Sequence, residues 1–154
     1  MTSDVLIDTR EGVLVLTMNR PNKKNALTGP MYDAMTAALT SAERDDAIRA
    51  VLLTGAGGAF TAGNDLGDFL AVAQGKAKPR AGAFIEAVAL LEKPIVAAVD
   101  GVAVGVGTTM CSTATSFTRR RPRNSACPSS IWASYRTRPP YSCRCVSGWR
   151  RRPS

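Results

Sequence analysis

The chain changes composition sharply between Met110 and Cys111, and this change limits how much of it can form one globular domain. Residues 1–110 contain 10 Lys and Arg against 12 Asp and Glu, a net charge of −2. Residues 111–154 contain 10 Arg and neither Lys nor acid, a net charge of +10 that accounts for the +8 of the whole chain. Such a change is typical of a domain boundary or a disordered arm. We predict a globular part, residues 1–110, and an irregular or disordered tail, residues 111–154, that forms no domain.

The composition also excludes several classes of function. Histidine is absent, which excludes mechanisms that need a Ser-His-Asp triad, a Cys-His pair or a histidine-bound metal. No run of 18 apolar residues is present, and the chain starts with acids such as Asp4 and Asp8 where a signal peptide has basic residues. We therefore expect a cytoplasmic protein without a membrane partner. All four cysteines lie in the tail without paired-cysteine spacing, so we predict no metal site.

Apolar periodicity predicts alternating strands and helices in the globular part. Met31, Met35 and Leu39 recur at helical spacing, whereas short β-branched runs bounded by glycine or proline are typical of strands. The expected strands cover 5–7, 13–16, 50–53 and 95–99, and the expected helices cover 30–44, 65–74 and 81–92. The first two strands have hairpin spacing around Gly12. Alternating elements with strands apolar on both faces indicate an α/β fold.

A glycine-rich turn, Gly105-Val106-Gly107, follows the last of these strands and opens another helix. The first N–H groups of a helix have no partner inside it and point outward, so this turn offers backbone donors to negative charge. Phosphate binding is the general interpretation of such a turn. The spacing of the glycines matches neither the Walker motif nor the full dinucleotide fingerprint.

Three segments of the globular part resemble the crotonase, or enoyl-CoA hydratase/isomerase, superfamily when they are taken together and in order. They are Asn19-Arg20-Pro21 with Asn25-Ala26-Leu27, then 59–66 (AFTAGNDL), and finally 93–101 (KPIVAAVDG) leading to 105–107. The resemblance covers about residues 4–110, which is less than half of a usual member. It implies a truncated crotonase-like ββα spiral that binds an acyl-CoA thioester. Coenzyme A is part of the substrate, so no separate cofactor is expected.

The resemblance also implies how such a site works. Negative charge builds on the thioester oxygen when the substrate loses an α-proton or gains a nucleophile, and two preorganised N–H donors stabilise it by about 3–4 kcal/mol each. The family's two donors map to the backbone amides of Asn64 and Val106. Further positions that match its substrate-binding segments are Lys23, Lys24, Ala26, Leu27, Ala62, Gly63, Asp65, Leu66, Gly105 and Gly107.

Several of these residues have simpler interpretations, which stay open. Ala62, Gly63 and Asn64 could form an ordinary turn, and Lys23 and Lys24 could belong to a solvated loop instead of contacting CoA. Asp65 is expected to cap the short helix that follows, in preference to a catalytic role. Asp68 is expected at the surface.

The resemblance also indicates what the chain lacks. The segment 63–66 (GNDL) is more similar to the Δ3,Δ2-enoyl-CoA isomerase branch than to hydratases, which use two glutamates. Thr109 occupies the position of one of these glutamates and cannot act as a general base. The isomerase acid lies in a downstream Leu-Gly-Leu-Val-Pro-acid segment, which is absent here. We therefore expect no isomerase or hydratase (lyase) activity of the kind used in fatty acid metabolism.

The genetic code offers an origin for the tail. If one base were lost between codons 110 and 111, the original second and third bases would survive in the tail codons. Residues 111–120 then permit the sequence LLHCDLVYAA, and residues 124–144 permit KFRMPFVDLGLV followed by PDAASLLLP. The end of KFRMPFVDLGLV and the start of PDAASLLLP together give the missing Leu-Gly-Leu-Val-Pro-acid segment, with aspartate as its acid. We interpret the tail as an out-of-frame translation.

A different class of function remains as the alternative. The runs 119–123 and 150–152 are rich in arginine and would attract phosphates, and tail aromatics could stack on bases. The alternative is a non-catalytic protein that binds acyl-CoA, or RNA through this tail. Under the main hypothesis there is no evolved nucleic-acid partner, and the homotrimer or hexamer of the family is not formed.

Overall fold

A computed structural model describes residues 4–119, and the predictions for residues 120–154, including Cys127, Cys143, Cys145 and the arginine runs, lie outside the described residues. The elements are β1 (Val5–Arg10), β2 (Val13–Met18), η1 (Pro21–Lys23), α1 (Gly29–Glu43), β3 (Ala50–Gly55), α2 (Leu66–Ala73), α3 (Ala81–Leu90), β4 (Ile95–Val99), α4 (Val106–Thr113) and β5 (Ser116–Arg119). The predicted strands, helices and α/β class are confirmed: β4 has the predicted bounds, whereas β1, β2 and β3 are two or three residues longer where their ends pair with neighbours.

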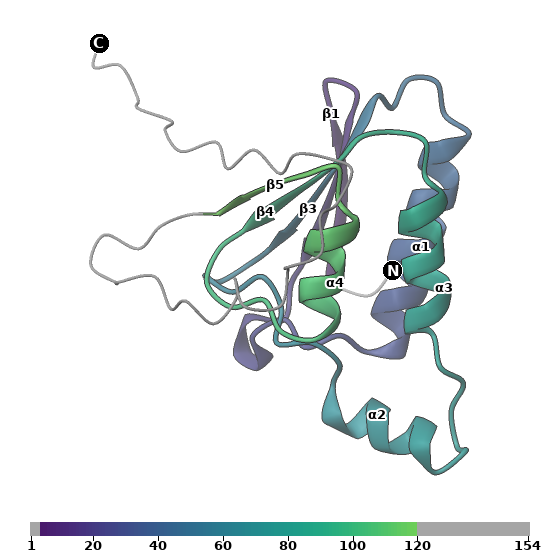
Figure 1. The fold of residues 1–154 in the computed structure, drawn as a ribbon, viewed down its shortest axis with the longest axis vertical. Coiled ribbons are helices and arrows are strands. Elements are labelled where there is room, and N and C mark those ends of the chain that lie inside the picture. Colours follow the sequence, from purple (N-terminus) through teal and green to yellow (C-terminus); the bar gives the residue numbers. More distant parts are fainter. Residues whose placement is uncertain (1–3, 120–154) are drawn as a thin grey trace.

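The five strands form one sheet in the order β1-β2-β3-β4-β5. The β1–β2 hairpin is antiparallel, and every later pair is parallel. Figure 1 shows α1, α3 and α4 on one side of this sheet, with α2 set apart from it. Because β2, β3 and β4 run parallel, the loops that follow them meet at the same edge of the sheet. This edge is where ligands bind in α/β proteins.

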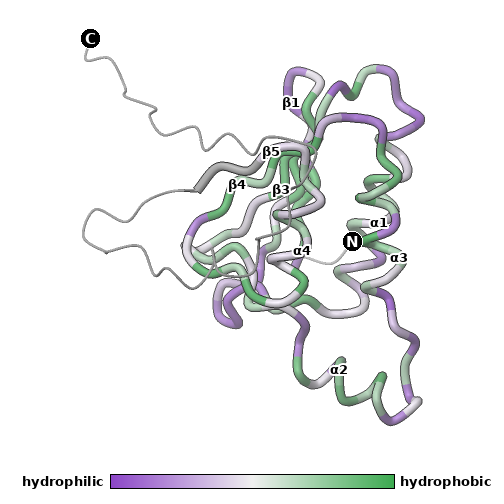
Figure 2. Tube along the Cα trace, in the orientation of Figure 1, coloured by the Kyte–Doolittle hydropathy of each residue, from purple (hydrophilic) through white to green (hydrophobic). Residues whose placement is uncertain are grey.

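The core lies between the sheet and the helices. Leu14, Leu16 and Met18 alternate with less buried residues along β2, and β3 and β4 show the same alternation. The buried stripe of α1 includes Met31, Met35 and Leu39, the residues whose spacing predicted the helix, and it packs against the same core. Figure 2 shows apolar residues along the strands and on these helices.

The opposite side of the sheet is apolar but only half-buried. Val13, Val15, Leu52 and Val96 point there with intermediate burial, and so does Leu6 of β1, which is 48% exposed. Figure 1 shows no described helix covering this side. The strands therefore have the two apolar faces that the sequence predicted, and helices of the described part cover one of them.

The structure differs from the sequence prediction at the boundary after Met110. Helix α4 continues through this position to Thr113, and β5 then pairs in parallel with β4. Met110 is fully buried, and Cys111 packs partly buried against the core, where burial raises the pKa of its thiol to about 11. Residues 111–119 therefore continue the fold. Residues 111–113 extend a helix that has already started, which gains one hydrogen bond for each residue added, and residues 116–119 pair with β4.

Candidate functional site

Asn25 holds together the loops that follow β2 and β3. Its side chain is completely buried; Nδ2 donates to the carbonyl oxygens of Ala56 and Ala59 at 2.8 and 2.7 Å, and Oδ1 accepts from the backbone N–H of Arg20 at 2.8 Å. Its φ of +56° lies in the left-handed region, which asparagine tolerates better than most residues. The Asn-Ala-Leu motif therefore begins with a residue that joins two loops.

The end of this motif pairs with the Ala-Gly-Asn turn. The N–H of Leu27 donates to the carbonyl of Gly63, and the N–H of Asp65 donates to the carbonyl of Leu27, both at 2.8 Å. These two bonds form a parallel bridge between Leu27 and Asn64. The backbone on both sides of Asn64 is therefore fixed by Leu27, a residue that is 1% exposed.

The Ala-Gly-Asn turn also pairs with the segment that leads into α4. The N–H of Thr61 donates to the carbonyl of Val102 at 3.0 Å, and the N–H of Val104 donates to the carbonyl of Thr61 at 3.1 Å. A Cβ atom on Gly63 would lie 3.0 Å from the carbonyl oxygen of Val104, and one on Gly107 would lie 2.5 Å from Cγ2 of Thr61. The two turns therefore contact each other so closely that Gly107 leaves no room for a side chain.

The two predicted donors lie in these adjoining turns. The N–H of Asn64 takes no part in the bridge to Leu27, and Val106 is the first residue of α4, after Gly105 with φ +56°. Within residues 4–119, neither amide donates a hydrogen bond to another group of the protein. Gly107 and Thr108, in contrast, donate back to Val104 and Gly105. Unpaired backbone amides of this kind are available to donate to an anionic or carbonyl oxygen.

The other predicted site residues differ in how exposed they are. Lys23 and Lys24 are exposed, Ala26 and Ala62 are half-buried, and Leu66 is 78% exposed at the start of α2. The carbonyl of Lys24 accepts from the N–H of Ala62 at 2.9 Å, so the backbone of the lysine loop contacts the Ala-Gly-Asn turn. The lysine side chains are thus free to reach a ligand near this turn, although no described contact directs them to one.

Asp65 caps α2, as the sequence predicted. Its carboxylate accepts from the N–H of Gly67 at 3.0 Å and pairs with Arg20 at 3.1 Å. Partial burial by itself raises the pKa of this carboxyl, but the hydrogen bonds from Arg20 and from the backbone of Gly67 and Asp68 outweigh it, so the pKa lies below the ordinary value of 3.8. Asp65 is therefore ionised at neutral pH and already has partners.

Asp68 was predicted at the surface, and this prediction is wrong. The carboxylate is half-buried and accepts from the N–H of Gly29 at 2.5 Å, which caps the first turn of α1. Thr28, the N-cap residue of that helix, makes no side-chain cap itself. Asp68 lies 39 residues from Gly29 in sequence, so no local pattern could indicate the contact.

Sequence reasoning also missed Tyr32 and Thr61 as residues of this site. The Tyr32 hydroxyl donates to Oδ1 of Asn64 at 2.5 Å, and the Thr61 hydroxyl donates to the carbonyl of Asn25 at 2.7 Å. Tyr32 falls within the apolar stripe of α1, where an aromatic residue is interpreted as core. Only its phenolic hydroxyl distinguishes it from an ordinary core residue, because a buried tyrosine usually finds a hydrogen-bond partner.

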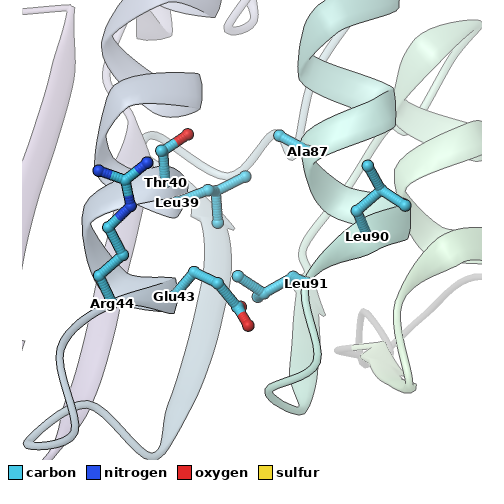
Figure 3. Close-up of a pocket in the computed structure, with 7 residues that line it drawn as sticks. All are labelled: Leu39, Thr40, Glu43, Arg44, Ala87, Leu90 and Leu91. Carbon is cyan, nitrogen blue, oxygen red and sulfur yellow. The ribbon is translucent and has the colours of Figure 1, made fainter.

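A hollow lies away from the two turns. A groove of about 240 Å³ lies between the C-terminal ends of α1 and α3, with Leu39, Ala87, Leu90 and Leu91 on its apolar side (Figure 3). None of its lining residues belongs to the three motif segments. Within residues 4–119, no group of three or more potential metal ligands is present, and no helix is long and apolar enough to cross a bilayer.

The sheet and the two turns define a class: an α/β protein with paired backbone donors at the carboxyl ends of parallel strands. Comparison with known proteins identifies the family within this class. The chain belongs to the enoyl-CoA hydratase/isomerase family, which it matches over residues 8–117. The resemblance found in the sequence, and the crotonase-like fold that it implied, are confirmed.

Three similar proteins illustrate the relationship. The chain is 40% identical over 118 residues to 1,2-epoxyphenylacetyl-CoA isomerase of Escherichia coli, with 71% of this chain and 45% of the relative covered. It is 38% identical to rat enoyl-CoA delta isomerase 2, covering 69% of this chain and 28% of the relative. A solved enoyl-CoA hydratase/carnitine racemase-like protein of Magnetospirillum magneticum superposes with a TM-score of 0.70 at 41% identity, covering 77% and 47% of the two chains. The chain thus spans less than half of the length of these relatives.

The ion pair of Asp65 with Arg20 predicts a pH-dependent contribution to stability. Because folding lowers the pKa of Asp65, its contribution is full above about pH 4 and is lost as the pH falls through the lower pKa of the folded state. Asp65→Asn keeps the helix cap but removes the charge. We expect it to lower the free energy of unfolding at pH 7 by up to about 1 kcal/mol, since the pair is partly exposed.

Urea unfolding of both proteins between pH 7 and pH 2 measures this effect. The difference between wild type and Asp65→Asn should shrink below about pH 4 and disappear at lower pH. Asp46→Asn, at an exposed acid, is the matched control and should follow the wild type throughout. A difference that stays constant down to pH 2 would contradict this electrostatic interpretation.

Proposed function

We propose that this chain is a partial enoyl-CoA hydratase/isomerase-family protein that can bind an acyl-CoA thioester oxygen but does not turn the substrate over. The observation that carries the proposal is the pair of unpaired amides, Asn64 and Val106, in turns that are fixed against each other. Donors that are already oriented need no reorganisation when charge develops on the oxygen, and removal of one costs about 3–4 kcal/mol in comparable sites. The ten other predicted contacts of the substrate, from Lys23 to Gly107, remain part of this proposal.

The lack of turnover follows from the acids and hydroxyls beside the two turns. Asp65 is ionised, caps α2 and pairs with Arg20, while Asp68 caps α1. Thr109, where the family's hydratases carry glutamate, presents a hydroxyl that cannot act as a general base at neutral pH. A positioned acid or base contributes about 10²–10⁴-fold to such reactions. We therefore infer that the proton carrier of the ancestral enzyme lay beyond the matched part of the chain.

An incomplete domain also accounts for the exposed apolar surface. The half-buried side of the sheet, together with Leu66, Phe69 and Leu70 on α2, leaves apolar groups exposed that a complete domain would cover. Together with the compositional change after Met110, this supports an N-terminal part joined to an out-of-frame tail, whose residues 111–119 complete α4 and add β5. We infer that the chain does not form the family's homotrimer or hexamer. The coding DNA across codons 105–115 tests this origin: a continuous second frame encoding the missing half supports it.

A chromophoric thioester tests the proposed oxyanion hole without any turnover. In 4-(dimethylamino)cinnamoyl-CoA, hydrogen bonds to the carbonyl oxygen stabilise its charge-separated excited state and shift the absorption to longer wavelength. We expect this red shift when the protein is in excess, with a Kd of about 1 mM because much of the pocket is absent. Unlabelled acyl-CoA should reverse the shift. No shift at saturating protein would contradict the proposal.

The same preparation should leave a 3-enoyl-CoA unchanged. The product, a conjugated 2-enoyl thioester, absorbs in the ultraviolet, so isomerisation can be followed directly. A full-length family isomerase serves as the positive control. Turnover by the purified chain that scales with its concentration would refute the absence of a proton carrier.

Calorimetry separates this proposal from the alternative of a non-catalytic binding protein. The partial enzyme should bind acyl-CoA weakly and RNA only through non-specific, salt-dependent attraction. Binding of acyl-CoA in the micromolar range or tighter would favour an acyl-CoA-binding protein. Tight binding of RNA that survives high salt would favour the RNA-binding alternative.

A further inference from the structure

The contact between Tyr32 and Asn64 joins a core helix to the first proposed donor. The phenolic oxygen of Tyr32 lies 2.5 Å from Oδ1 of Asn64, although the two residues are 32 positions apart in sequence. Tyr32 is 4% exposed, whereas Asn64 is exposed. The contact therefore runs from the interior of the domain to the surface at the Ala-Gly-Asn turn.

Tyr32 is itself held firmly. Its ring packs against Phe84 of α3 with the ring centres 5.7 Å apart, and the N-terminus of its helix is capped by Asp68 from α2. Burial raises the pKa of Tyr32 to about 12, so the hydroxyl keeps its proton at neutral pH and can donate it. Tyr32 thus provides a fixed donor in the vicinity of the turn.

Two hydrogen bonds to Leu27 hold the backbone on both sides of Asn64, and one further bond holds its side chain. Its neighbours Gly63 and Asp65 pair with Leu27, but the Asn64 N–H takes part in neither bond. Gly63 has a φ of +93°, a conformation that glycine reaches easily and leaves easily. Within residues 4–119, the bond from Tyr32 is the hydrogen bond that holds the Asn64 side chain, and it adds a third fixed point to the two backbone bonds.

We propose that Tyr32 is a positioning residue: its hydroxyl holds the Asn64 side chain and thereby keeps the Asn64 amide directed toward the thioester oxygen. This role rests on the proposed function of the two amides and adds to it a residue outside the motifs. Tyr32 does not touch the substrate oxygen itself. Its effect on the amide passes through the side chain of Asn64.

Nuclear magnetic resonance of the ligand-free protein tests this role directly. In Tyr32→Phe, which keeps the ring packing, the backbone order parameter of Asn64 should fall measurably below a wild-type value of about 0.85, while that of Val106 stays unchanged. Thr40→Val is the matched control, because it removes a hydroxyl from the same helix that bonds only to the carbonyl of Thr36. An unchanged order parameter for Asn64 in Tyr32→Phe, or a value already low in the wild type, would overturn the proposal.

The chromophoric thioester provides a second readout that a merely structural role would not change. Tyr32→Phe should reduce the red shift extrapolated to saturating protein, which reports the polarisation of the bound carbonyl and not the amount bound. In the Asn64→Ala background, Tyr32→Phe should cause no further reduction, because the acceptor of its hydroxyl is already gone.

The two readouts separate the possible failures. A wild-type protein without any red shift would contradict the proposed oxyanion hole, while the order parameters would still decide the role of Tyr32. A normal wild-type red shift that Tyr32→Phe leaves at full size would overturn the positioning role alone. If Tyr32→Phe reduced the red shift as much in the Asn64→Ala background as in the wild type, the positioning role would also be overturned, since the hydroxyl would then act by another route.

Discussion

Replacement of Asn25 by alanine is expected to lower the free energy of unfolding by about 3–5 kcal/mol, the largest effect of any single change considered for this chain. The substitution removes three hydrogen bonds, one buried and two partly buried, and leaves the N–H of Arg20 and the carbonyls of Ala56 and Ala59 without their partner. An unsatisfied buried polar group costs about 1–3 kcal/mol. Alanine also tolerates the φ of +56° less well than asparagine does.

Urea unfolding followed by circular dichroism measures this change. If the wild type is itself less stable than the predicted loss, the variant should lose the dispersed amide signals of a folded protein under native conditions. Asn22→Ala is the matched control, because Asn22 is an exposed residue of the same loop, and it should change stability by less than about 0.5 kcal/mol. An Asn25→Ala variant within 1 kcal/mol of the wild type would show that the loops are not joined in this way.

Gly107→Ala should have the second-largest effect, and it should act on the site as well as on stability. The new Cβ would lie 2.5 Å from Cγ2 of Thr61, a buried residue whose hydroxyl bonds to both Asn25 and Gly63. Thr61 cannot turn away without breaking these bonds, so the two turns must separate. We expect a loss of about 2–3 kcal/mol in stability, which is typical of overpacking, and loss of the red shift of the chromophoric thioester.

Gly82→Ala provides the matched control for this prediction. Gly82 also lies within a helix, but nothing approaches within 4 Å of the position where its Cβ would lie. Alanine is the better helix former, so this variant should be more stable by about 0.5–1 kcal/mol and keep the red shift. If both glycine variants were stabilised equally, the close contact between the two turns would be contradicted.

The sequence predicted the elements of the fold well because their signals are local. The spacing of Met31, Met35 and Leu39 defines a helix face wherever that helix packs, and the observed α1 differs from the predicted range by one residue at each end. The ends of β2 and β3 were predicted too early. Thr17, Met18, Thr54 and Gly55 extend these strands because they pair with each other across the sheet, and a partner strand cannot be identified from one segment alone.

The candidate site was predictable only in part for a related reason. The glycine-rich segment 105–107 indicated the turn before α4, but only the resemblance to a family indicated that this turn lies beside Asn64. The bonds that bring them together, between Leu27 and Gly63 and between Thr61 and Val104, join backbone groups whose residue types carry no signal. Asp68 and Tyr32 were missed because each side chain makes its important contact with a distant segment.

We propose that this chain keeps two oxyanion donors but was translated without its proton carrier. The most direct measurement compares this chain with the product of the same gene after one base is inserted between codons 110 and 111. Both purified proteins would be assayed with a 3-enoyl-CoA, and both would be tested for the red shift of the chromophoric thioester. We expect a red shift with both proteins and isomerisation only by the frame-restored one. Isomerisation by the present chain, or a frame-restored protein that is equally inactive, would contradict it.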